Sequence, residues 1–137
     1  MGPPARILLV AHRTAATPKL LEHVRTRASE SECVFVLVVP RPYWDPETEQ
    51  AAQVIELAVP LLEEAAGTHV EAILGDSDPF VAVREALERS QFDEVIVSTL
   101  PRRLSHWLRL DLPARVERLG VRVTVIEATE SDRTWES

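Results

Sequence analysis

The sequence has 137 residues, of which 45% are hydrophobic and 27% charged, and its formal net charge is −7. These values suit one domain with an ordinary apolar core, and the excess of acids argues against nucleic acid as a partner. The single cysteine, Cys33, excludes an intramolecular disulfide, and no Cys/His cluster has the spacing of a metal site. Since neither a membrane span nor an export signal is recognisable, we expect a cytoplasmic protein with no membrane partner.

Five short β-branched runs are predicted to be strands. In chain order they are Arg6–Ala11, Cys33–Val39, His69–Leu74, Glu94–Ser98 and Val121–Ile126. The first, second and fourth are almost wholly apolar, which is typical of central strands that are covered on both faces of a parallel sheet. Polar residues are interleaved in the third and the fifth, so these two are predicted to lie at the edges of the sheet.

Segments with helical spacing of apolar residues separate the strands. Three of them begin with a capping residue before proline, at Thr17-Pro18, Asp45-Pro46 and Asp78-Pro79. The side-chain oxygen of such a residue can accept from a backbone N–H of the first turn, and proline is tolerated there because that turn has no acceptor for its missing N–H. Asp111-Leu112-Pro113 predicts a similar restart inside the last helical region, and Pro60 predicts a kink in the second helix.

The alternation of strands and helices predicts an α/β fold. It has three layers, α/β/α, around a doubly wound, five-stranded parallel sheet in the order 3-2-1-4-5. Residues 1–128 would form this single domain, and the polar residues 129–137 would form a C-terminal tail. In sheets of this kind ligands bind beyond the carboxyl ends of the strands, where the strand order reverses.

Charge is distributed unevenly along the chain. Residues 45–94 carry 13 acids and 2 bases, whereas residues 95–122 carry 6 arginines and 2 acids. The predicted strand order brings the loops after the first and fourth strands to the same end of the sheet. Arginine side chains and hydroxyl donors in these loops could converge on a phosphate or a carboxylate. The predicted anion-binding residues are His12, Arg13, Thr14, Ser98, Thr99, Arg102 and Arg103.

No catalytic constellation can be recognised. The four histidines have no identifiable nucleophile or acidic partner in the sequence, so no catalytic residue is predicted. Two other functions occur on this fold class. A phosphorelay receiver domain would use Asp76 after the third strand but lacks the acidic pair after the first, where His12-Arg13 stands. FMN binding would need a phosphate loop, and residues 14–17 offer two hydroxyls but no glycine.

The layout resembles the universal stress protein family over nearly the whole chain. Ile7–Ala11, followed by a polar loop, looks like the first strand of that family, and Gly75-Asp76 with Phe92–Ser98 looks like the stretch before and through its fourth strand. The final helix and Val121–Ile126 complete the match. The resemblance implies the same fold, a role in stress response and a homodimer. Pairing of the exposed edge Val121–Ile126 with its copy would form that dimer.

The ATP-binding branch of the family has a glycine motif that this sequence does not keep. Val97, Leu100 and Leu110 stand at the three glycine positions and Asp111 at the following Ser/Thr position. Glycine there would let the backbone approach phosphate oxygens, whereas leucine obstructs that approach and a carboxylate repels phosphate. The sequence thus predicts no cofactor and disfavours ATP. It indicates a non-catalytic protein that binds a partner or a small anion; the alternative is a nucleotide binder with slow phosphohydrolase activity that uses arginines in place of the glycine loop.

Overall fold

The computed structural model describes residues 3–41 and 49–128. The strands in this part of the chain are β1 (Ala5–Val10), β2 (Cys33–Pro40), β3 (Val70–Gly75), β4 (Glu94–Thr99) and β5 (Arg122–Glu127). The helices are α1 (Pro18–Glu30), α2 (Glu49–Ala66), α3 (Pro79–Arg89), α4 (His106–Arg109) and α5 (Leu112–Glu117), and a 3-10 turn spans Arg102–Leu104. Each strand begins and ends within one residue of its predicted bounds.

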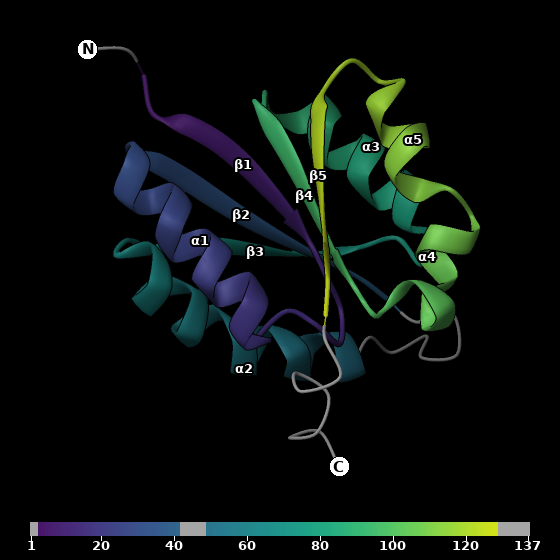
Figure 1. The fold of residues 1–137 in the computed structure, drawn as a ribbon, viewed down its shortest axis with the longest axis horizontal. Coiled ribbons are helices and arrows are strands. Elements are labelled where there is room, and N and C mark those ends of the chain that lie inside the picture. The colour runs from purple at the N-terminus through teal and green to yellow at the C-terminus, as the bar shows by residue number, and fades with distance from the viewer. Residues whose placement is uncertain (1–2, 42–48, 129–137) are drawn as a thin grey trace.

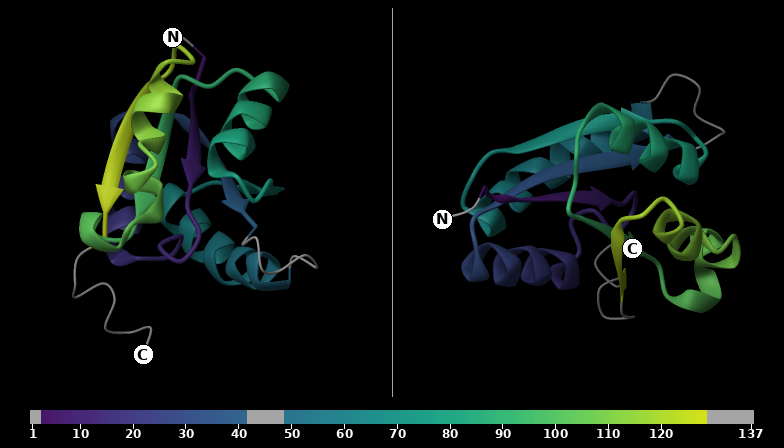
Figure 2. Two further views of the ribbon diagram at one scale, coloured as in Figure 1. Left: turned by 90° about the vertical axis from the view of Figure 1, so that its right-hand side faces the viewer. Right: turned by 90° about the horizontal axis from the view of Figure 1, so that it is seen from above.

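The strands form one parallel sheet in the order β3-β2-β1-β4-β5 (Figure 1). The predicted fold class, strand order and edge strands are therefore confirmed. Helices α1 and α2 cover one face, and α3, α4 and α5 lie on the other (Figures 1 and 2). No helix among the described residues is long and apolar enough to cross a membrane.

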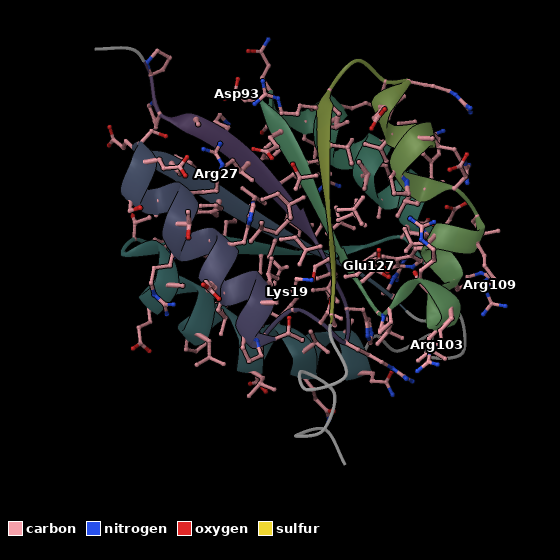
Figure 3. All side chains as sticks on the ribbon, in the orientation of Figure 1. Lys19, Arg27, Asp93, Arg103, Arg109 and Glu127 are labelled. Carbon is pink, nitrogen blue, oxygen red and sulfur yellow. The ribbon has the colours of Figure 1, made fainter. Side chains whose placement is uncertain are left out.

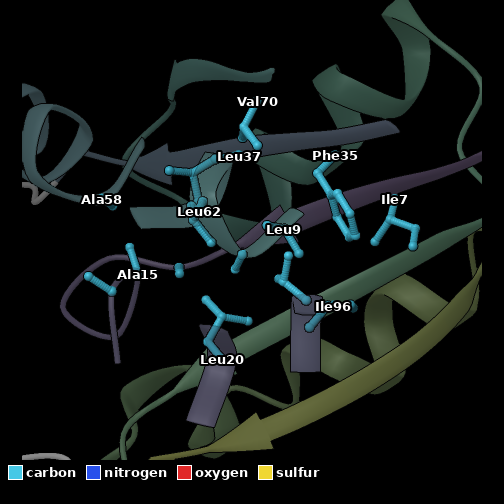
Figure 4. Close-up of a cluster of buried hydrophobic side chains, with 14 of the residues drawn as sticks. Ile7, Leu9, Ala15, Leu20, Phe35, Leu37, Ala58, Leu62, Val70 and Ile96 are labelled. Atoms are coloured by element: carbon cyan, nitrogen blue, oxygen red, sulfur yellow. The ribbon is translucent and has the colours of Figure 1, made fainter. Parts of the chain in front are cut away.

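Each face of the central strands supplies its own half of the core. On β1, Ile7 and Leu9 pack with the cluster under α1 and α2, while Leu8 and Val10 pack with the cluster under α3 and α5. All four side chains are fully buried. This alternation explains why residues 7–10 of the strand are all apolar, since both of its faces are covered. Figure 4 shows Phe35 and Leu37 of β2 beside Ile7 and Leu9 in the first cluster.

The helix starts follow the predicted chemistry only in part. The Asp78 carboxylate accepts a hydrogen bond from the Phe80 backbone N–H at 2.9 Å, as expected of a cap. Thr17 precedes α1 but does not cap it through its side chain; its hydroxyl donates to the carbonyl of Thr14. Asp111 begins α5 in a left-handed conformation, with φ 58°, and also makes no side-chain cap.

Three other predictions, on a helix cap, the C-terminal tail and a helix kink, stay predictions. The cap predicted at Asp45-Pro46 and the tail 129–137 lie outside the described residues. Pro60 lies inside α2, which is assigned as one helix from Glu49 to Ala66, and the kink expected there stays a prediction.

Candidate functional site

A cavity of about 680 Å³ lies at the carboxyl ends of β1, β2 and β4, on the side of the sheet that carries α3–α5. Five of the seven predicted site residues line it: His12, Arg13, Thr14, Ser98 and Thr99. The first three follow β1 and the other two end β4, and these strands are paired. The strand order thus places both loops on one cavity, at the point where chain connections leave in opposite directions.

Buried hydroxyl groups connect the two loops. The Ser98 hydroxyl donates to Thr14 Oγ1 at 2.8 Å, and the Thr17 hydroxyl donates to the Thr14 carbonyl at 3.1 Å. Thr14 and Ser98 are only 2% and 1% exposed, so water competes little for these bonds. Thr14 lines the cavity, and the oxygen of its hydroxyl already accepts one hydrogen bond.

A second hydroxyl pair fixes the segment after β4. The hydroxyls of Thr99 and Ser105, both buried, share a hydrogen bond. Ser105 also caps α4, since its oxygen accepts from the Leu108 N–H at 3.1 Å. This segment is therefore wound into a 3-10 turn and a short helix, each with its own internal hydrogen bonds.

Arg102 and Arg103 do not line the cavity. Both lie in the 3-10 turn and are exposed, and Figure 3 shows Arg103 on the outer side of this region with Arg109. The turn is held in place by the side chain of Glu127, which accepts from the Arg102 N–H at 2.7 Å. The two arginines lie in the loop after β4, as the sequence predicts, but the winding of that loop directs them away from the cavity.

Two arginines that were not predicted line the cavity instead. Arg41 follows β2, and both its backbone N–H and its Nε donate to the Gly75 carbonyl at 3.2 Å. Arg115 of α5 lies over the ring of Phe80, 4.4 Å from the centroid, in a cation–π contact. Arg41 could have been found from its position at the end of a central strand. Arg115 could not, because its place depends on how α5 packs against α3.

The charges that line the cavity are mostly positive. Arg13, Arg41 and Arg115 form no ion pair with a carboxylate in the described part of the chain. Asp78 is the acid that lines the cavity among these residues, and its carboxylate is engaged in capping α3. Three guanidinium groups around one recess, with one acid already engaged by an N–H, create a positive potential that favours an anion.

Metal ligation has no support in the described ranges. There, no group of three or more His, Cys, Asp or Glu side chains is placed to hold a metal ion.

No protein-family model matches the sequence, and no curated protein matches it either. Solved structures do match. A universal stress protein in complex with cAMP has 14% sequence identity and a TM-score of 0.69, and the match covers 93% of this chain and 100% of that one. A universal stress protein family protein from Arabidopsis thaliana with AMP bound has 15% identity and a TM-score of 0.64, with coverage of 93% and 94%.

A third match extends the likeness to an archaeal protein. The universal stress protein from Archaeoglobus fulgidus in complex with dAMP has 15% identity and a TM-score of 0.58, and the match covers 94% of this chain and 100% of that one. Identities this low establish the architecture and leave the ligand open. This chain has the fold of the universal stress proteins.

Proposed function

We propose that this chain is a non-catalytic binding protein that holds a small anionic ligand in the cavity between the ends of β1 and β4. The observation that carries the proposal is the set of three cavity arginines, Arg13, Arg41 and Arg115, that have no carboxylate partner in the described part of the chain. A guanidinium group binds a carboxylate or a phosphate in a forked geometry. The hydroxyl of Thr14 would add a neutral donor to the same ligand.

Thermal unfolding in inorganic phosphate tests this proposal. We expect phosphate to raise the melting temperature beyond the effect of potassium chloride at equal ionic strength. A ligand at 100 times its Kd adds about 2.7 kcal/mol to the free energy of unfolding. Arg13→Gln should weaken phosphate binding roughly tenfold, because a charge-assisted contact is lost.

The matched control is Arg109→Gln, which makes the same charge change on α4 outside the cavity. Equal shifts in both variants would mean that phosphate acts through general surface charge, and would contradict the proposed site. The absence of any phosphate-specific shift would contradict it as well.

Nucleotide binding is the second candidate function. It is favoured by the similar structures that were solved with cAMP, AMP or dAMP. In this alternative, Arg102 and Arg103 hold the phosphates in place of a glycine loop, and slow phosphohydrolysis follows. Because neither arginine lines the cavity, the phosphates would lie outside it. A thermal shift with ATP that Arg102→Ala and Arg103→Ala abolish, together with release of phosphate from ATP, would favour this candidate over the first.

We also propose a homodimer formed through the edge strand β5. Among the described residues no strand pairs with the outer edge of β5, and Val125 of this strand is 38% exposed. Strand edges of this kind pair readily with a second copy.

We expect light scattering to show a dimer, and Val125→Lys to shift it to the monomer. Leu74→Lys, on the opposite edge strand β3, is the matched control and should leave the dimer intact. A monomer at high concentration would exclude the dimer.

A further inference from the structure

The lining of the cavity includes an apolar wall as well as arginines. This wall is formed by Leu100, Leu104, Trp107 and Leu110, all from the segment between β4 and α5. Leu104 is 39% and Leu110 is 45% exposed, values that are high for leucine side chains. Exposed apolar side chains that gather at a recess are typical of ligand sites.

Several backbone amides of this wall are already engaged and are not free to bind a phosphate. The N–H groups of Leu104, Ser105, Arg109 and Leu110 all donate to carbonyls within the segment, between Pro101 and His106. The Arg102 N–H donates to Glu127. Since these amides are already satisfied, they add little to the binding of an anion, and the arginines of the cavity are its main donors. The side chains that the segment places on the cavity are those of Leu100, Leu104, Ser105, His106, Trp107 and Leu110, of which four are apolar.

Arginines from outside this wall supply the charge of the cavity. Arg13 follows β1, Arg41 follows β2, and Arg115 is held over Phe80. The N-terminus of α3 adds little to them, because the Asp78 carboxylate already accepts from its first turn. One recess is therefore lined by guanidinium groups and by leucine and tryptophan side chains, and its volume of about 680 Å³ is in the range of sites that hold small organic molecules.

We propose that the ligand is an amphipathic organic anion, with one carboxylate or phosphate head and an apolar body of about two fused rings. The inference rests on the proposed function, because it assigns the chemical class of the ligand of the same cavity. The head pairs with Arg13 and Arg115, and the body lies against Leu104, Trp107 and Leu110. A nucleotide fits this arrangement less well, because its ribose and base would place polar groups on the apolar wall.

The test compares probes that separate head from body, by isothermal titration calorimetry. 1-Naphthyl phosphate has both parts, inorganic phosphate has only the head, 1-naphthol has only the body, and AMP joins the head to a polar body. We expect 1-naphthyl phosphate to bind at least about tenfold more tightly than each of the other three, since burial of one ring face contributes at least one factor of ten. 1-Naphthoate should also bind, and its affinity relative to the phosphate shows which head group the site prefers.

Substitutions separate the contribution of the apolar side chains to the affinity from that of the arginines. Leu104→Ser combined with Leu110→Ser should weaken 1-naphthyl phosphate binding about tenfold and leave inorganic phosphate binding unchanged. Leu119→Ser, at a leucine of similar exposure that does not line the cavity, should change neither.

The possible failures are distinguishable. If inorganic phosphate or AMP binds as tightly as 1-naphthyl phosphate, and Arg13→Gln still weakens it, the amphipathic ligand class is wrong while the anion site stands. If no anionic probe binds, or if Arg13→Gln and Arg109→Gln behave alike, the anion site itself is wrong and the inference fails with it.

Discussion

Replacement of Arg27 by methionine is expected to lower the free energy of unfolding by about 3 kcal/mol. The Arg27 guanidinium lies 3.1 Å from the carboxylate of Glu94, whose side chain is 7% exposed at the start of β4. The other carboxylate oxygen accepts from the Thr124 hydroxyl at 2.6 Å. Methionine keeps the apolar stem of Arg27 but leaves a buried carboxylate without its cation, which is costly. Urea denaturation of the purified protein measures the loss.

A double-mutant cycle separates the ion pair from helix packing. In Glu94→Gln the buried charge is gone, so a further Arg27→Met change should cost about 1 kcal/mol or less. Arg27 also lies 3.7 Å from Glu30 on the same helix, an exposed pair that contributes little. If Arg27→Met costs the same with and without the Glu94 carboxylate, the buried pair is not the source of the effect.

The fold could be predicted because its signals are local and repeated. β1, β2 and β4 are almost wholly apolar over their central residues, and this pattern places them in the middle of the sheet. Because crossover connections are right-handed and short, only a few strand orders then remain possible for the sheet. Thr17 shows where local rules fail: a residue of the right type for a cap accepts no hydrogen bond through its side chain from the first turn of α1, while its hydroxyl donates to the Thr14 carbonyl.

The site was harder to predict, for a different reason. His12, Arg13 and Ser98 could be placed because each follows or ends a central strand, and strand ends are fixed by the topology. Arg102 and Arg103 lie only three and four positions beyond β4, yet the winding of their segment turns them outward. The sequence predicts a glycine loop without its glycines, with Val97, Leu100 and Leu110 at the glycine positions and Asp111 after them. The structure makes it a capped short helix with an apolar face, and Arg115 reaches the cavity through tertiary packing alone.

Substitution of Gly75 by alanine is expected to destabilise the protein by about 2 kcal/mol, through overpacking. A Cβ at this position would lie 2.7 Å from the Cβ of Ala82 and 2.9 Å from Cγ2 of Val38. The Ala82 Cβ is attached directly to the backbone of α3, so the clash can be relieved only by moving that helix. The same movement would disturb Phe80 beneath Arg115, and phosphate affinity should fall together with stability.

Two further variants test whether the close approach of Gly75 to Ala82 explains this loss of stability. Gly67→Ala places a Cβ in open space and carries only the strain of a positive φ of 73°, so it should cost about 1 kcal/mol. It should not affect phosphate binding, because Gly67 follows α2, away from the cavity. Ala82→Gly removes the opposing methyl group, and the pair Gly75→Ala/Ala82→Gly should therefore be more stable than the sum of the two single losses. If the two single losses of stability simply add in thermal or urea unfolding, the distance between α3 and β3 does not depend on this contact. Gly75 would then have no part in positioning the cavity.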